Sequence, residues 1–345
     1  MGSGRHKAAG AASALLILSC AVAHAQSAPT WSKLVVNVGF SAFGGVGGYD
    51  TYARLLARHI GKYLPGTPTV IVANKPGAGG LTVMNYMYNA APRDGSEIAM
   101  VGRGNAMEPM LFGQQSRSKF DASKFAWIGS MNKEISVFAV MQRQPIELKD
   151  VLSGAPLAVG VPGAGSDPYV FGLLMNRLLG ANLKIIAGYP GMNEVQLAMD
   201  NGELAGVTGV SWDSFRVDKA PWLKAGRAKV ILQFAAERSA DLAEVPTLSE
   251  LVKEVRDRRV IDLVMTRQTM GRPLLAPPSV SQDRVNALRA SYSSAMKDPN
   301  LIAEAEKMGM ALRSVDGPTI QKIIDDMAKA PVDVLERART VLTQP

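Results

Sequence analysis

Short β-branched runs alternate with amphipathic segments along most of the chain. The first run, residues 33–38, is followed by a glycine-dense stretch and then by a helical pattern that begins near Asp50. We expect Asp50 to be the N-cap of this helix, because a short polar side chain there satisfies free backbone N–H groups. Its apolar positions fall near i, i+3, i+4 and i+8, at Tyr52, Leu55, Leu56 and Ile60.

The same strand–helix unit recurs to the end of the chain. Further strands are predicted at residues 69–72, 97–101, 125–128, 137–141, 157–161, 184–187, 204–207 and 230–234. Helices are predicted at residues 81–90, 169–179 and 192–201, and after Pro273 at 281–296, 301–308, 319–328 and 332–340. Strands that alternate with helices of this length predict an α/β fold with mostly parallel sheets.

Length and composition narrow the class of protein. The 345 residues suggest two domains, and they include one cysteine and three histidines. One cysteine excludes an intramolecular disulfide and a cysteine-rich metal site. The net charge of +8 is spread along the chain without a cluster of basic and aromatic residues, so we expect no nucleic-acid partner.

The first 25 residues have the pattern of an export signal. A basic start at residues 5–7 precedes the apolar run 8–22, and Ala23-His24-Ala25 supplies a small-x-small cleavage motif. We therefore predict cleavage after Ala25 and a periplasmic protein that keeps no cysteine and one histidine, His59. Two alternatives stay open: an uncleaved N-terminal anchor, and lipidation of Cys20 in a poor lipobox.

Four glycine-rich loops stand between a predicted strand and a predicted helix: residues 40–50, 74–80, 102–105 and 162–166. At the carboxyl edge of parallel strands such loops face the ligand crevice of α/β folds, and the helix start behind each adds a positive dipole end. The pattern therefore favours a binding cleft for a small anion over loops that serve only as turns. The candidate contacts from these loops are Phe40, Ser41, Gly44, Gly45, Asn74, Gly77, Gly79, Gly163 and Gly165.

Five side chains are candidates for more specific roles. Arg103 follows a strand end directly and suits bidentate pairing with a carboxylate, with a surface arginine over a turn as the alternative. The hydroxyl of Ser166 suits both capping of the following helix and contact with an anion. Tyr189 and Trp212, together with Phe40, are candidate walls of the cleft or parts of the local core.

Catalysis and cofactor binding have little support. The helical pattern puts His59 on or beside an apolar face, which favours a half-buried structural histidine over a general base. No G-x-S-x-G elbow and no cluster of metal ligands occur, and Asp50 stands where a dinucleotide fingerprint requires Gly or Ala. We predict no catalytic residue, no metal and no cofactor; an exported α/β hydrolase or transferase is the alternative.

These loops carry a family resemblance. The chain resembles the tripartite tricarboxylate transporter receptors, also called Bug-type extracytoplasmic solute-binding proteins, over nearly its whole length after the signal segment. The resemblance rests on six segments in order: residues 44–57, Asn74-Lys75-Pro76-Gly77-Ala78-Gly79-Gly80, Ala91-Pro92-Arg93-Asp94-Gly95, Gly163-Ala164-Gly165-Ser166, Gly188-Tyr189-Pro190-Gly191 and residues 272–278.

The resemblance implies a two-lobed periplasmic-binding-protein fold that closes like a flytrap on a small carboxylate. It implies a first lobe of residues 26–128 plus 248–345 and a second lobe of residues 129–247. The ligand would be a mono-, di- or aromatic carboxylate gripped by the loops at 40–48 and 163–166. The partner would be a membrane permease, or a membrane sensor in the alternative reading, and the receptor itself would be a monomer.

The chain departs from the family pattern in the loops that would touch ligand. Its first loop is about two residues longer than usual, within residues 43–48. Gly202-Glu203-Leu204-Ala205 lacks the Asp that many members carry after Gly-Glu-Val. The following Gly209-Val210-Ser211-Trp212 suggests that the floor of the pocket is lined by different side chains than in other members.

Overall fold

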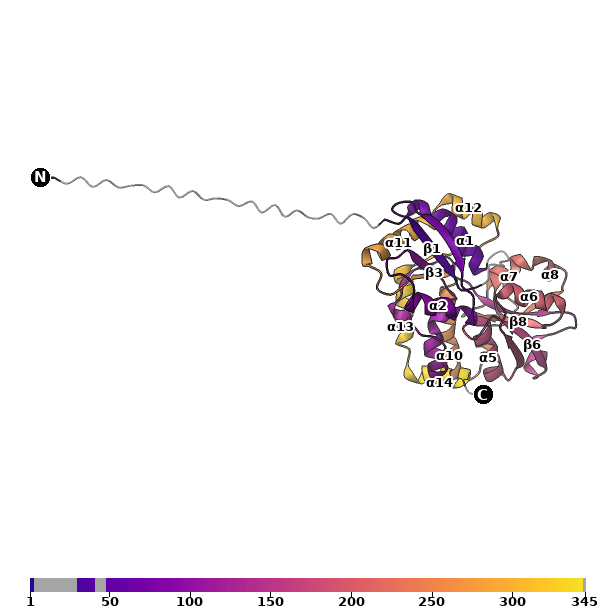
Figure 1. Ribbon diagram of the computed structural model, residues 1–345. Coiled ribbons are helices and arrows are strands. Elements are labelled where there is room, and N and C mark those ends of the chain that lie inside the picture. Colours follow the sequence, from indigo (N-terminus) through magenta and orange to yellow (C-terminus); the bar gives the residue numbers. More distant parts are fainter. Residues whose placement is uncertain (3–29, 41–47, 344–345) are drawn as a thin grey trace.

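The chain folds into two lobes that each surround one β-sheet (Figure 1). The computed structural model describes residues 1–2, 30–40 and 48–343. The predicted signal segment and the first glycine-rich loop therefore lie outside the described residues. The predicted two-lobed α/β architecture is confirmed.

The first lobe is built on a sheet whose strand order is β11-β4-β10-β3-β1-β2. Its strands are β1 (Lys33–Val38), β2 (Thr69–Asn74), β3 (Glu97–Met100), β4 (Ala126–Ser130), β10 (Pro273–Ala276) and β11 (Val315–Asp316). Its helices are α1 (Tyr49–Ile60), α2 (Leu81–Asn89), α3 (Glu108–Phe112), α11 (Gln282–Ala295), α12 (Pro299–Lys307) and α13 (Gly317–Ala328).

The second lobe is built on a sheet of order β7-β6-β8-β5-β9. Its strands are β5 (Ser136–Met141), β6 (Pro156–Val161), β7 (Asn182–Ala187), β8 (Gly206–Ser211) and β9 (Ala228–Phe234). Its helices are α4 (Leu148–Leu152), α5 (Asp167–Leu179), α6 (Met192–Asn201), α7 (Trp212–Asp218) and α8 (Ala220–Lys224).

Both sheets are mixed, which corrects the expectation of mostly parallel sheets. In the first lobe β1 pairs in parallel with β2 and β3, whereas β10 is antiparallel to both β3 and β4. In the second lobe β6 is parallel to β7 and β8, whereas β5 is antiparallel to β8 and β9. The physical reason is the path of the chain: β5 enters the second lobe directly from β4, and β10 returns from it, so each runs against its neighbours.

The two segments that cross between the lobes are hydrogen-bonded to each other. The backbone N–H of Gly271 donates to the carbonyl of Asn132 (2.8 Å), and that of Glu134 donates to the carbonyl of Gln268 (3.1 Å). A Cβ on Gly271 would lie 2.7 Å from the Asn132 carbonyl oxygen, so the close approach requires glycine there. The crossing is thus a paired ribbon of residues 131–135 and 268–272.

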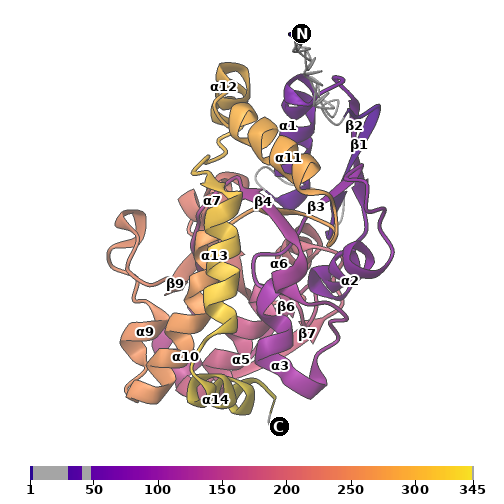
Figure 2. The same ribbon diagram turned by 90° about the vertical axis from the view of Figure 1, so that its left-hand side faces the viewer.

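Helix α14 (Val332–Thr343) joins the lobes a second time. It packs against α3 of the first lobe and against α5 of the second, and also against α10 (Val255–Met265), which follows the short helix α9 (Leu248–Leu251) (Figure 2). Its buried face consists of Val334, Ala338, Val341 and Leu342. One apolar core therefore runs from α2 and α3 through α14 to α5 and β6.

Helix α1 begins two residues earlier than the sequence pattern indicated. Its N-cap is Gly48, and Asp50 lies in the first turn, which corrects the prediction that Asp50 is the cap. The Asp50 carboxylate instead accepts hydrogen bonds from Arg54 (2.8 Å) and from the Asn74 side chain (2.8 Å). The predicted apolar face is buried as expected at Tyr52, Leu55, Leu56 and Ile60.

The stacked pair of Phe171 and Phe234 tests the contribution of this shared core. Their rings are parallel with centroids 4.3 Å apart, and both side chains are fully buried. We predict that Phe171→Ala lowers the free energy of unfolding by about 3–5 kcal/mol, because it leaves a cavity in close-packed surroundings. Leu197→Ala, at a side chain that is 60% exposed, is the control and should change it by less than about 0.5 kcal/mol. Urea unfolding followed by circular dichroism measures both; equal effects would contradict the assignment.

Candidate functional site: a cavity between the lobes

A cavity of about 110 Å³ lies between the two lobes. On the first-lobe side it is bordered by Phe40, the start of α1, Gly79, residues 102–104 and Arg272. On the second-lobe side it is bordered by the starts of α5, α6 and α7. Ligands of two-lobed α/β proteins bind in such crevices at the carboxyl ends of strands.

Three helices of eight residues or more direct their N-termini at this cavity. Helices α1, α5 and α6 have Gly48, Ser166 and Gly191 as their N-cap residues, and none of these caps its helix with a side-chain hydrogen bond. The first backbone N–H groups of a helix have no intrahelical acceptor, and the helix dipole makes this end positive. The cavity is therefore suited to an anion.

The hydroxyl of Ser166 differs from its predicted role as a helix cap. It donates to the carbonyl oxygen of Gly163 (2.6 Å) and so closes the loop on itself. This bond fixes the tight turn of residues 163–166 before α5. The hydroxyl does not cap α5, and the second residue of that helix, Pro168, has no N–H, so the open donor at the start of α5 is the backbone N–H of Asp167.

The lobes touch backbone to backbone at Gly79 and the loop before α5. Gly79 has a φ of +67°, and a Cβ there would lie 2.6 Å from the backbone nitrogen of Ser166. A Cβ on Gly163 would likewise lie 2.8 Å from the nitrogen of Gly79. Neither loop tolerates a side chain at these positions while the lobes are in contact.

Asn105 bridges the same contact with its buried side chain. Its amide nitrogen donates to the carbonyl of Gly79 (3.0 Å) in the first lobe and to the carbonyl of Gly165 (2.7 Å) in the second. Its amide oxygen accepts from the N–H of Gly102 (2.8 Å). One side chain thus ties together three of the four glycine-rich loops.

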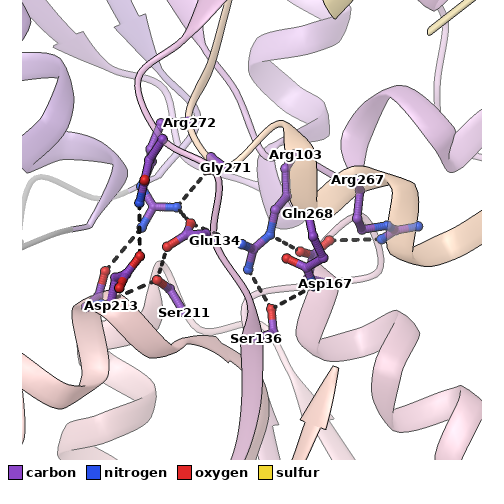
Figure 3. Close-up of polar contacts among 12 residues, drawn as sticks. Arg103, Glu134, Ser136, Asp167, Ser211, Asp213, Arg267, Gln268, Gly271 and Arg272 are labelled. Atoms are coloured by element: carbon purple, nitrogen blue, oxygen red, sulfur yellow. Dashed lines mark hydrogen bonds and ion pairs between the residues drawn. The ribbon is translucent and has the colours of Figure 1, made fainter. Parts of the chain in front are cut away.

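Five buried charged side chains form a chain of ion pairs (Figure 3), three of which, Arg103, Asp167 and Arg272, border the cavity. In order it runs Arg272, Glu134, Arg103, Asp167, Arg267, and no side chain in it is more than 7% exposed. Arg103 contacts Glu134 at 3.0 Å and also pairs with Asp167, whose other oxygen lies 2.9 Å from Arg267. We call this set the buried charge chain. It links the crossing ribbon, the end of β3 and the start of α5.

The buried charge chain has three guanidinium groups and two carboxylates. Burial by itself raises the pKa of Asp167, but Arg103 and Arg267 outweigh it and hold that pKa below its usual value. Asp167 is therefore ionised at neutral pH. The chain carries one positive charge in excess, and both Arg103 and Arg272 border the cavity.

Aromatic rings fix the position of the two arginines. Tyr49 stacks on Phe40 with centroids 4.6 Å apart, and the Arg272 guanidinium lies 4.5 Å from the Tyr49 ring centroid. The Tyr49 hydroxyl accepts a hydrogen bond from the backbone N–H of Arg103 (3.1 Å). Ring and guanidinium planes of this kind hold each other in place by cation–π attraction.

The structure brings together some of the residues that the sequence singled out. Phe40, Gly79, Arg103, Gly165 and Ser166 border the cavity. Ser41, Gly44 and Gly45 lie outside the described residues. The cavity border does not include Asn74, Gly77, Gly163, Tyr189 or Trp212.

Those outlying candidates have local contacts of their own. Asn74 donates to the Phe40 carbonyl (2.9 Å) and to Asp50, and so holds the strand end beside the start of α1. The Trp212 indole donates to Asp241 (3.3 Å), and both Trp212 and Tyr189 pack on the apolar core of the second lobe. Their role in ligand binding stays a prediction.

Sequence reasoning did not single out Tyr49, Glu134, Asp167, Gln196 or Arg272. The charged residues of this set cannot be told from surface residues in the sequence, because their ion-pair partners are far away along the chain. Arg103 and Asp167, for example, are 64 positions apart. Arg272 opened the last segment of the family resemblance, which was the one available signal for it. Gln196 has no sequence signal, since a glutamine on a helix is most often exposed.

The histidine considered as a general base lies away from the cavity. His59 lies half-buried on α1, where its ring nitrogens contact Glu304 on α12 (2.7 Å) and Asp298 (3.3 Å), and it does not border the cavity. Among the described residues no group of His, Cys, Asp and Glu is arranged to hold a metal ion. No helix in the same part of the chain is both long and apolar enough to span a bilayer.

Comparison with known proteins defines the class. The fold is that of two-lobed binding proteins. MatC from Rhodopseudomonas palustris, solved with bound malate, superposes on the chain with a TM-score of 0.66 at 21% sequence identity. The superposition covers 90% of this chain and 98% of MatC. The periplasmic binding protein BugD has a TM-score of 0.67 at 19% identity, covering 90% of this chain and 97% of BugD. A further R. palustris protein, Rpa4515 with adipate, has a TM-score of 0.67 at 16% identity over 89% of this chain and 97% of its own.

The sequence matches the tripartite tricarboxylate transporter family receptor over residues 52–338. A relative from Cupriavidus necator, described as a UPF0065 protein in the gbd 5′ region, is 28% identical over 309 residues, which is 87% of this chain and 86% of the relative. The chain belongs to the tripartite tricarboxylate transporter receptor family, as its loops suggested. This is a family of solute-binding receptors.

Asp167 is the central anion of the buried charge chain, so its replacement tests the chain. We predict that Asp167→Asn lowers the free energy of unfolding by about 3–5 kcal/mol at pH 7, because it leaves the buried Arg267 without a carboxylate and Arg103 with Glu134 alone. Asp333→Asn is the control: its pair with Arg259 is exposed, and it should cost less than about 1 kcal/mol. Denaturant unfolding measures both variants.

The same variant has a defined pH dependence. Because the folded pKa of Asp167 lies below the unfolded value of about 3.9, its ionic contribution is fully present above about pH 5 and is lost as the pH falls through the folded pKa. The difference in stability between wild type and Asp167→Asn should therefore be constant from about pH 5 to pH 7 and shrink below about pH 4. A difference that grows on acidification would contradict this assignment.

Proposed function

We propose that this protein captures a small carboxylate in the cavity between its lobes and releases it to a membrane transport system. The observation that carries the proposal is the convergence of three uncapped helix N-termini on a cavity bordered by a charge chain with one excess positive charge. Both features stabilise a negative group without a free cation at the surface. The bound carboxylate would neutralise the excess charge.

The relatives support this ligand class. MatC holds malate and Rpa4515 holds adipate, and both share the two-lobed fold. In this chain we propose that Gly165 and Ser166 of the second lobe, with Phe40 and the start of α1 in the first, surround the carboxylate. Arg103 and Arg272 act through their field, since their guanidiniums are already engaged by Glu134 and Asp167.

Closure of the lobes is the proposed working motion. Gly79 and Asn105 make contacts that exist only while the lobes are together, and they lie beside the cavity. A ligand that contacts both lobes favours this closed state over an open one. We propose the crossing ribbon, residues 131–135 and 268–272, as the hinge, with the second lobe between its two segments.

We further propose that the chain is exported, loses its first 25 residues after Ala25, and acts in the periplasm as a monomer without a cofactor. Its proposed partner is a permease of the tripartite tricarboxylate type, which recognises the closed form. Catalysis is not part of the proposal, because the one histidine of the exported chain is held on the far side of α1 by Glu304 and Asp298.

The proposal is tested by isothermal calorimetry on purified, ligand-stripped protein with a broad panel of mono-, di-, hydroxy and aromatic carboxylates. We expect saturable binding of at least one acid, with thermal stabilisation of about 3 kcal/mol at a ligand concentration a hundred times Kd. Neutral alcohols and amides of the same size are the controls. If no acid in the panel binds, the proposal fails.

Gly165→Asp tests the site within the cavity. A Cβ at Gly165 would lie 2.6 Å from the Leu81 side chain and 2.9 Å from the Ala78 carbonyl, and the carboxylate adds a negative charge at the start of α5. We predict a loss of carboxylate affinity of about a hundredfold or more, since closure and charge are both opposed. The matched control is Gly226→Asp, which has open space and a left-handed φ of +63° that Asp tolerates. Equal affinity in both variants would remove this loop from the site.

A further inference from the structure

Gln196 places a buried amide at the cavity, and the oxygen of this amide is left without a hydrogen-bond donor. It lies on α6, its side chain is 2% exposed, and it borders the cavity. Its amide oxygen has no hydrogen-bond partner within the described residues. A buried amide without a partner costs about 1–3 kcal/mol, so a residue of this kind marks a place where a bound molecule completes the bonding.

The start of the same helix supplies donors beside this acceptor. Gly191 is the N-cap of α6 and has no side chain, so the N–H groups of Met192 and Asn193 have no intrahelical acceptor. All three residues border the cavity, as Gln196 does one turn further along the helix. A group bound here meets donors from the helix start and an acceptor from Gln196.

This place is distinct from the start of α5. Strands β6 and β7 are parallel neighbours, and the helices that follow them pack in different apolar clusters, α5 in the core shared by both lobes and α6 in that of the second lobe alone. Apolar side chains of Met192 and Val210 also border the cavity. A ligand that reaches from α5 to α6 thus has two polar ends and an apolar middle.

The charged residues around the cavity indicate which chemical group fits at the second end of the ligand. The buried charge chain has a single positive charge in excess, which one carboxylate neutralises. Asp50, which also borders the cavity, is paired with Arg54 (2.8 Å) and adds no net charge with it.

We propose that Gln196 and the start of α6 select a ligand with one carboxylate and, at its far end, a neutral group that both donates and accepts, namely a hydroxyl or a carboxamide. Such a group donates to the Gln196 oxygen and accepts from the N–H groups of α6. An ammonium group has no lone pair with which to accept a hydrogen bond, and its positive charge is repelled by the positive end of the helix dipole. An ionised carboxylate has no proton to donate to the Gln196 oxygen. This inference rests on the proposed function and names its ligand class.

The test uses straight-chain acids of four to six carbons whose far end is methyl, hydroxyl, carboxamide or carboxylate. Calorimetry on the full chain compares the four end groups at each length. We expect the hydroxyl and carboxamide acids to bind about tenfold or more tightly than the methyl-ended and carboxylate-ended acids, because only they satisfy the buried amide. Tightest binding by the dicarboxylate would overturn the inference.

Two variants separate the role of Gln196 from general packing. Gln196→Met keeps the size but cannot hydrogen-bond, and it should cost the hydroxyl acid about tenfold while leaving the methyl-ended acid unchanged. Gln196→Glu keeps an acceptor oxygen but adds a negative charge, so it should weaken the hydroxyl acid and the methyl-ended acid alike and preserve the advantage of the hydroxyl acid. If the ligand's far end instead accepted from the Gln196 amide nitrogen, Gln196→Glu would abolish that advantage, and the inference would be wrong.

Gln114→Met, at an exposed glutamine outside the cavity, is the matched control and should leave every end-group ratio unchanged. Thermal unfolding without ligand verifies that each variant folds. An end-group preference that survives Gln196→Met overturns the inference while leaving carboxylate capture intact. Binding of none of these acids, nor of any in the broad panel, overturns the proposed function and this inference with it.

Discussion

The buried charge chain is the constraint around which the two lobes are organised. Glu134 lies on one crossing segment and Arg272 on the other, Arg103 follows β3 of the first lobe, and Asp167 opens α5 of the second. An ion removed from water keeps its charge only if its partners are fixed in place. The geometry of the crossing ribbon, of the cavity border and of the start of α5 is therefore set by one network. In the proposed function, the stability of the fold and the attraction of the ligand depend on the same five side chains.

Above this network the site is made chiefly of backbone. Glycine at positions 79, 163 and 165 lets two loops from different lobes meet with no side chain between them, and Asn105 joins their carbonyls. In the proposed function, backbone N–H groups and helix ends bind the anion without long flexible side chains, so closure costs little conformational entropy. Specificity would then depend on the few side chains that border the cavity, of which Gln196 is 2% exposed.

The elements that sequence predicted well are those whose burial is periodic and local. Strand β1 and helix α6 match the expected residues 33–38 and 192–201, because each buries one face against its own lobe. Strand β10 was not foreseen: it is a four-residue run, and its antiparallel place between β3 and β4 follows from the return of the chain. Among the site residues, glycine loops were visible in sequence. Glu134, Asp167 and Arg272 were not, since only tertiary contacts make a charged residue a buried one.

The contact between Gly79 and the loop at 163–166 has a consequence for the history of this protein. The two loops lie in different halves of the chain, yet each leaves the other no room for even a methyl group while the lobes touch. A substitution in one is accepted only with a matching displacement of the other. We therefore expect substitutions at these positions to be correlated, and a change of ligand to come from side chains elsewhere on the cavity wall.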